Sequence, residues 1–178
     1  MKRETALQKL LRASAFAADK HRKCRRKDVE ATPYINHPIE VANVLSQEAG
    51  IHEVDVLVAA LLHDTIEDTD TRKSEIAKLF GKRVARIVAE VSDDKRLPKS
   101  ERKRLQVEHA AHISKDAKLV KLADKTVNLR DMATNPPALW SLARRREYFD
   151  WAKEVVDQAR GVNPKLEAIF DKAHRRRP

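Results

Sequence analysis

The sequence has little glycine, few aromatic residues and a single cysteine. Its 178 residues include 3 Gly and 1 Cys, and aromatic residues make up 4% of the chain. So few glycines leave few positions for tight hairpin turns, and no stretch shows a sustained strand-like alternation of apolar and polar residues. The single cysteine, Cys24, excludes an internal disulfide and is typical of a protein from a reducing cytosol.

Long apolar runs are absent as well. The charged first segment, MKRETALQKLLRASAFAADKH, lacks the apolar centre of a secretion signal. No run approaches the roughly 18 apolar residues that a spanning helix requires. We therefore expect a cytoplasmic protein that has no membrane partner.

Positive charge is in excess. The chain has 37 Lys and Arg against 27 Asp and Glu, which gives a formal net charge of +10. Such a charge favours a polyanionic partner, which can be nucleic acid, an anionic membrane surface or a small molecule with several phosphates, although a highly soluble surface explains it equally well.

Helical patterning is abundant, and it predicts an all-α fold made of one helical bundle over residues 1–178. Apolar residues recur at spacings of three and four in most segments. We expect helices at about 4–22, 38–50, 54–62, 116–133 and 135–161. Two short helices separated by Gly81 are expected within 71–93. A further helix should begin after Pro98, and the last should lie in the segment from 163. We expect the basic end, residues 172–178, to be a frayed tail.

One histidine and four acidic residues gather at the end of the most apolar predicted helix. The segment AALLHDTIEDTD contains His63, Asp64, Glu67, Asp68 and Asp70. Two interpretations are open: a solvated acidic helix end, or part of a metal site. We assign Asp70 to the surface.

Two residues elsewhere favour the metal site. His37 precedes Pro38 at a predicted helix entrance, and Asp124 lies in a segment apolar enough to be core, where an unpaired acid would cost several kcal/mol. Together with His63 and Asp64 they form a mixed nitrogen and oxygen ligand set that suits Mn²⁺, Fe²⁺, Mg²⁺ or Zn²⁺.

Several motifs in order carry a family resemblance. They are TPYINHPIEVA, ALLHDTIEDTD and KLVKLADKTVNLRDM, supported by HRKCRRKDVEATPYINHP, DDKRLPKSERKRLQVEHA and REYFDWA. The order H…HD…D resembles the HD phosphohydrolase superfamily. Over about residues 5–160 the chain is similar to the hydrolase domain of the Rel/Spo alarmone enzymes, especially the small stand-alone alarmone hydrolases, the group that includes the metazoan SpoT homologue.

The resemblance implies a reaction and a role for each motif residue. One Mn²⁺ is held by His37, His63, Asp64 and Asp124, although other divalent cations also suit the ligands. The catalytic residues Glu67 and Asp68 activate water. The implied reaction is hydrolysis of the 3′-pyrophosphate of ppGpp or pppGpp to GDP or GTP and pyrophosphate. The chain leaves no room for the synthetase domain of the long enzymes, so we expect hydrolysis only.

The resemblance also implies a substrate pocket. Its predicted lining residues are Arg26 and Lys27 at the base, Tyr34 and Tyr148 as aromatic neighbours, Lys99 at the 5′-phosphates, and Asn128 at the sugar or its waters. Two positions near the base depart from the long enzymes, since Cys24 replaces Gln and Asp28 replaces Ser. These departures leave the choice between guanine and adenine open.

Other functions are also open. The same site can act on ppApp-type alarmones or remove the 2′-phosphate of NADPH, and the sequence does not separate these substrates. A basic nucleic-acid-binding module with a vestigial HD site is the alternative of another class, supported by the clusters RRKD, KRLPKSERKR and RRR. The few aromatic residues and the intact ligand set argue against a nucleic-acid partner. The oligomeric state cannot be predicted from the sequence.

Overall fold

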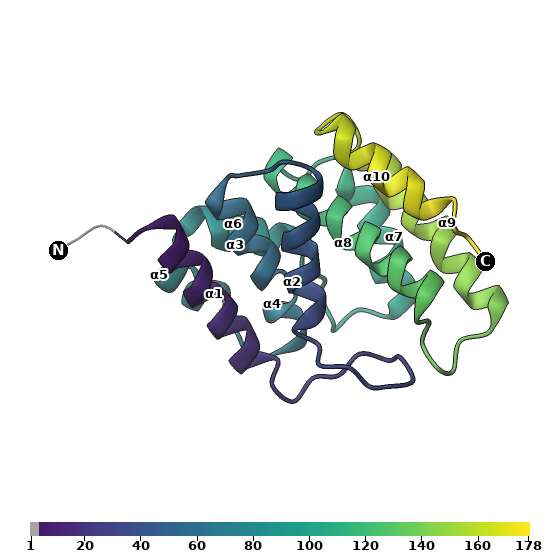
Figure 1. The fold of residues 1–178 in the computed structure, drawn as a ribbon, viewed down its shortest axis with the longest axis horizontal. Coiled ribbons are helices and arrows are strands. Elements are labelled where there is room, and N and C mark those ends of the chain that lie inside the picture. The colour runs from purple at the N-terminus through teal and green to yellow at the C-terminus, as the bar shows by residue number, and fades with distance from the viewer. Residues whose placement is uncertain (1–3) are drawn as a thin grey trace.

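Helices make up most of the computed structural model, which describes residues 4–178 (Figure 1). They are α1 (Ala6–Lys20), α2 (Asn36–Asn43), the π-helical turn η1 (Val44–Glu48), α3 (Val54–Leu62), α4 (Thr65–Asp68), α5 (Lys73–Phe80), α6 (Lys82–Val91), α7 (Lys99–Ala110), α8 (Lys115–Thr134), α9 (Leu142–Ala159) and α10 (Pro164–His174). Residues 4–178 contain no strand, only one isolated bridge between Arg25 and Pro33. The predicted all-α class is confirmed.

Two helices form the centre of the bundle. In α3 every residue from Val56 to Leu62 is buried, as its apolar sequence predicts. Helix α8 packs against α2, α3, α6, α9 and α10, and it is buried on more sides than its amphipathic pattern predicts. As a result Lys121, Asp124 and Lys125 are buried together with the apolar residues of α8. Buried charges need partners, and the site described below supplies them.

The helix boundaries predicted at proline and glycine are confirmed, with shifts of a few residues. Helix α2 begins at Asn36, so Pro38 lies in its first turn, where a missing N–H costs nothing. The chain leaves η1 at Gly50, whose φ is +73°, and it passes from α5 to α6 through Gly81, whose φ is +99°. These positive values favour glycine.

The helix expected at 135–161 begins later than predicted. Helix α9 starts at Leu142, and the Ser141 side chain caps it by accepting from the Arg144 N–H at 3.2 Å. Pro136 and Pro137 explain the difference, because proline disfavours helical backbone in the preceding residue. The irregular segment that results borders a cleft of about 740 Å³, which Asn135, Pro137 and Trp140 line.

The interpretation of residues 172–178 as a frayed tail is wrong. Helix α10 continues to His174. Beyond it, Arg177 pairs with Asp150 at 2.8 Å, and the Arg146 Nε donates to the Pro178 carbonyl at 2.6 Å. Contacts with α9 therefore hold the basic end against the bundle.

The helices that carry the predicted metal ligands and catalytic acids lie in the middle of the molecule. In Figure 1 α1 and α5 lie toward one end and α9 and α10 toward the other, with α2, α3, α4 and α8 between them. None of the helices described within residues 4–178 combines the length and hydropathy that crossing a membrane requires.

Candidate active site

Three segments far apart in the chain meet at one point. His37 lies in the first turn of α2, His63 follows the last residue of α3, and Asp124 lies in the middle of α8. One donor atom from each of these residues lies within 4.8 Å of the other two. Donor atoms that each lie about 2 Å from one ion have a similar distance between them.

Both imidazole rings turn Nε2 toward the acids. His63 Nδ1 lies 2.8 Å from the Ala60 carbonyl oxygen, so Nδ1 donates and Nε2 faces the acids. His37 Nε2 lies 3.2 Å from Asp124 Oδ1, and His63 Nε2 lies 3.8 Å from the same oxygen. Both rings therefore present Nε2, the atom that can bind a metal, toward one carboxylate.

Asp64 lies at the edge of this group. Its Oδ2 is 3.0 Å from His63 Nε2 and 3.9 Å from His37 Nε2. The same oxygen accepts a hydrogen bond from the Tyr34 hydroxyl at 2.5 Å. All four predicted ligands, His37, His63, Asp64 and Asp124, line one small pocket of about 140 Å³. Because these residues are the predicted ligands, this pocket is called the metal pocket.

Neighbouring side chains stabilise the ionised forms of Asp64 and Asp124. Burial alone would raise the pKa of Asp64, yet the adjacent His63 keeps that pKa well below its usual value. For Asp124 burial is likewise opposed, mainly by Lys125, whose Nζ lies 3.2 Å from Oδ2, and its pKa is also lowered. Burial would lower the pKa of His63, but Asp64 outweighs it and raises that pKa to about 9. The buried carboxylate of Asp124 and the half-buried one of Asp64, with two imidazoles beside them, fit a divalent cation.

The two predicted catalytic acids lie on α4, beside the metal pocket. Glu67 Oε2 accepts from the Asp93 N–H at 3.2 Å, and its Oε1 lies 3.6 Å from Arg102 Nη1. Burial, with Asp64 and Asp93 nearby, raises the pKa of Glu67 to about 7. Asp68 pairs with Lys95. A carboxyl with a pKa near neutral can both take and return a proton at physiological pH.

In the metal-free protein we expect Glu67 to make the folded state less stable as the pH rises. The folded carboxyl keeps its proton to about pH 7, whereas its ordinary pKa is 4.5. The folded state therefore binds more protons in this range, and its stability falls with pH. Relative to the wild type, Glu67→Gln should gain about 3 kcal/mol of unfolding free energy between about pH 4.5 and pH 8. Urea unfolding in EDTA measures this; a pH-independent difference between the two proteins would contradict it.

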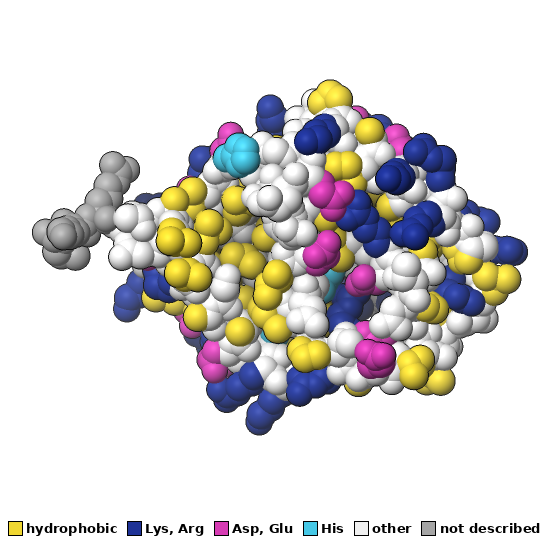
Figure 2. Space-filling view, in the orientation of Figure 1, with side chains coloured by type: hydrophobic (Ala, Val, Ile, Leu, Met, Phe, Trp, Pro, Cys, Tyr) yellow, Lys and Arg dark blue, Asp and Glu magenta, His cyan; other side chains and the backbone are white. Residues whose placement is uncertain are grey.

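A larger cleft of about 740 Å³ adjoins the metal pocket. The two share Tyr34, His37, Asp68 and Asn128. In Figure 2 this face of the molecule is hollowed near its centre, with acidic side chains beside the hollow. The cleft is lined by the predicted substrate residues Arg26, Lys27, Tyr34, Asn128 and Tyr148. Lys99 does not line the cleft. Its Nζ lies 5.6 Å from the ring of Trp140, and Trp140 lines the cleft.

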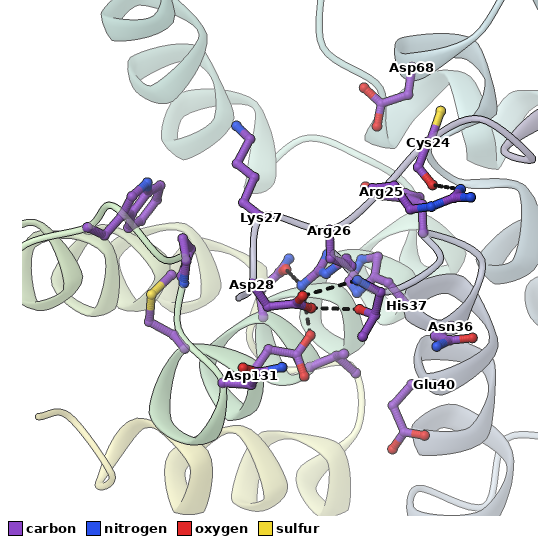
Figure 3. A pocket seen from close by; sticks show the side chains of 18 of the residues that line it. Cys24, Arg25, Arg26, Lys27, Asp28, Asn36, His37, Glu40, Asp68 and Asp131 are labelled. Carbon is purple, nitrogen blue, oxygen red and sulfur yellow. Dashed lines mark hydrogen bonds and ion pairs between the residues drawn. The ribbon is translucent and has the colours of Figure 1, made fainter. Parts of the chain in front are cut away.

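Arg26 connects the cleft to the metal pocket. Its Nη2 donates to Asp131 Oδ2 at 2.7 Å and to Asn128 Oδ1 at 3.3 Å. Figure 3 shows Asp131 beside Arg26, with Asp68 on the opposite side of the pocket. Asn128 in turn donates to Asp124 Oδ1 at 2.6 Å. A molecule bound by Arg26 would therefore lie next to the metal pocket. Cys24 and Asp28, which depart from the long enzymes, also line this cleft.

The sequence did not predict several ion pairs of the site. Lys125, Lys95 and Arg102 pair with Asp124, Asp68 and Glu67 respectively. Lys95 and Arg102 come from a charged stretch whose pattern is typical of helix or loop surface. Only for Lys125 was there a signal, because it follows Asp124 directly within an apolar segment.

A helical bundle that brings histidines and aspartates together in this order is typical of the HD phosphohydrolases, and sequence comparison agrees. The HD domain family matches residues 13–150. The chain belongs to the HD domain family.

Individual relatives narrow the assignment. The chain is 61% identical over 158 residues to the Homo sapiens guanosine-3′,5′-bis(diphosphate) 3′-pyrophosphohydrolase MESH1. This match covers 89% of this chain and 88% of the human protein. The Xenopus tropicalis protein of the same name is 59% identical over 162 residues, covering 91% and 90%. A solved structure, described as a metazoan ortholog of SpoT that hydrolyses ppGpp and plays a role in starvation responses, superimposes with a TM-score of 0.93 at 51% identity, covering 99% of this chain and 98% of that one. The resemblance to stand-alone alarmone hydrolases is confirmed.

Proposed function

We propose that this protein hydrolyses the 3′-pyrophosphate of ppGpp and pppGpp, using one Mn²⁺, and yields GDP or GTP and pyrophosphate. The observation that carries the proposal is the meeting of His37, His63 and Asp124 within 4.8 Å at the end of a large cleft. Relatives named guanosine-3′,5′-bis(diphosphate) 3′-pyrophosphohydrolase at about 60% identity support the substrate.

His37, His63, Asp64 and Asp124 would hold the cation. When bound, a divalent cation polarises a phosphoryl oxygen and lowers the pKa of water. Two imidazole nitrogens and two carboxylates suit Mn²⁺, and the pKa shifts of Asp64 and Asp124 support ionised ligands.

Glu67 takes the proton of the attacking water in this proposal. The water oxygen bonds to the phosphorus that is attached to the ribose 3′-oxygen, and the bond between that phosphorus and the 3′-oxygen breaks. The 3′-oxygen leaves with a proton, which Glu67 can return because its pKa lies near neutral. Asp68, paired with Lys95, lies at both the cleft and the metal pocket, where it can orient the water.

A group of cations at the mouth of the cleft supports phosphate binding by Lys99. Arg144 lies 4.2 Å and Lys99 5.6 Å from the Trp140 ring. Burial lowers the pKa of Lys99, and Arg144, Lys103 and Lys27 add to the effect by like-charge repulsion. A bound polyphosphate would relieve this repulsion. Arg26 and Tyr148, which line the same cleft, would contact the base and sugar.

Turnover of three nucleotides tests the proposed function. With Mn²⁺ we expect ppGpp to release pyrophosphate and the reaction to stop when EDTA is added. The same screen includes ppApp and NADPH, because Cys24 and Asp28 line the cleft. Release of orthophosphate from NADPH with no pyrophosphate from ppGpp would overturn the proposal in favour of a phosphatase.

We expect Tyr34→Phe to weaken Mn²⁺ binding by about 10- to 100-fold, as loss of a hydrogen bond to a metal ligand commonly does. The Tyr34 hydroxyl donates to Asp64 at 2.5 Å and so orients that carboxylate toward the histidines. Titration with Mn²⁺, followed by calorimetry, measures the change. Tyr148→Phe makes the same chemical change in the cleft and should keep the wild-type affinity; equal affinities for all three proteins would contradict the role of Tyr34.

A further inference from the structure

The loop between α6 and α7 covers one side of Glu67. Ser92 follows the last residue of α6, and Asp93 follows Ser92. The Asp93 backbone N–H donates to Glu67 Oε2 at 3.2 Å, while Arg102 Nη1, from α7, lies 3.6 Å from the other carboxylate oxygen. Both oxygens of Glu67 therefore depend on this loop and on α7 for their position.

Gln106 fixes the loop to α7. Its Nε2 donates to Asp93 Oδ2 at 2.6 Å. The carboxylate only accepts, so the amide nitrogen must face it. Gln106 follows Arg102 by four residues and lies on the same face of α7, one turn further along. The loop has a second anchor at its start, where Lys121 Nζ of α8 donates to the Val91 carbonyl at 2.7 Å.

Both side chains of this link are largely protected from water. The Asp93 side chain is 13% exposed. Gln106 lines the metal pocket as well as a separate cavity of about 260 Å³ behind the loop, which Arg102 also lines. A hydrogen bond from an amide to a carboxylate with little access to water is stronger than its surface equivalent. No interaction between Gln106 and the 740 Å³ cleft is present in residues 4–178, because Gln106 is not among the residues that line that cleft.

We propose that Gln106 is a positioning residue for Glu67: it holds the Asp93 carboxylate, and the Asp93 N–H thereby holds Glu67 against the metal pocket. The inference rests on the proposed function, in which Glu67 takes the proton of water. Within residues 4–178 Gln106 does not line the substrate cleft and makes no hydrogen bond to Glu67, although both residues line the metal pocket. Its loss should therefore change the chemical step and leave nucleotide binding as it was.

Kinetics of Gln106→Met test the proposal, since Met keeps the size of the side chain and removes the donor. We expect kcat for ppGpp to fall about 10- to 100-fold, as displacement of a general base does, with KM within about twofold. Glu108→Gln changes an exposed residue of the same helix and should match the wild type. Unchanged kcat in Gln106→Met, or a loss confined to KM, would overturn the proposal.

An exchange of the two side chains separates positioning from general damage to the fold. Gln106→Glu alone places two carboxylates together and should lower kcat as Met does. The double variant Asp93→Asn, Gln106→Glu restores one amide donating to one carboxylate with the wild-type net charge, and it should recover most of kcat. If Gln106→Met and Gln106→Glu both lose activity and the double variant recovers none of it, Gln106 does not act through Asp93.

Amide hydrogen exchange keeps this inference separate from the proposed function. In the wild type the Asp93 N–H should be protected by Glu67, and Gln106→Met should speed its exchange at least about tenfold. If wild-type protein fails to turn over ppGpp while this protection is lost as expected, the proposed function fails and the link stands. Equal exchange in both proteins would overturn the link itself.

Discussion

Asp124→Asn is expected to bind Mn²⁺ more than about 100-fold more weakly than the wild type and to lose measurable hydrolysis of ppGpp. Loss of a neighbour of a metal ligand already costs about 10- to 100-fold, so loss of the ligand charge should cost more. Asp124 is the carboxylate that both imidazoles face, with Oδ1 3.2 Å from His37 Nε2 and 3.8 Å from His63 Nε2. Asparagine keeps its shape and removes its charge.

The same substitution also leaves Lys125 without its acid. Lys125 is buried, and Asp124 raises its pKa. Thermal unfolding must therefore accompany the metal titration, so that loss of binding is separated from loss of the fold. Asp116→Asn, near the start of the same helix, removes a carboxylate that pairs with Arg83 and should keep wild-type metal binding. A folded Asp124→Asn protein with wild-type affinity for Mn²⁺ would refute the metal site.

Glu67→Gln is expected to lower kcat for ppGpp by about 10²- to 10⁴-fold, the contribution typical of a general base. Gln keeps the hydrogen bond from the Asp93 N–H, so the loop and the metal pocket should stay in place. Mn²⁺ affinity and KM should accordingly change little. The kinetics are measured at saturating nucleotide and metal, with metal binding determined in parallel.

A matched control for this variant is Glu75→Gln. Glu75 lies on α5 and pairs with Lys20 at 3.4 Å on the surface, away from the metal pocket. The control should retain the wild-type rate. If Glu67→Gln turns over ppGpp as fast as the wild type at saturating substrate, another group takes the proton and the assignment of Glu67 is wrong.

Helix boundaries were predictable where the signal is local. The segment Val54–Leu62 is a buried helix because nearly every residue in it is apolar, and the break at Gly81 follows from a backbone that only glycine adopts easily. The late start of α9 and the ordered end after α10 were not predicted. The start of α9 follows from a local signal that was not used, namely Pro136 and Pro137 before the Ser141 cap. The ordered end depends on contacts with another part of the chain, such as Arg177 with Asp150.

The predicted ligands illustrate the same division within the site. His37, His63, Asp64 and Asp124 could be selected because acids and histidines in apolar surroundings are rare and their order matches a known motif. The structure places all four in one pocket. Their binding of Mn²⁺ and the roles of Glu67 and Asp68 stay predictions.

The amino-acid sequence by itself determined the helices, the absence of disulfide-based stabilisation and the residue types from which a metal site can be built. Periodicity, glycine and proline act over a few residues, so they can be read directly from the chain. Only the tertiary structure decided which charges face one another. It paired Lys125 with Asp124, set Arg102 beside Glu67 and joined Gln106 to Asp93. Electrostatic and hydrogen-bond energies depend on distance and burial in three dimensions, and spacing along the chain does not contain either.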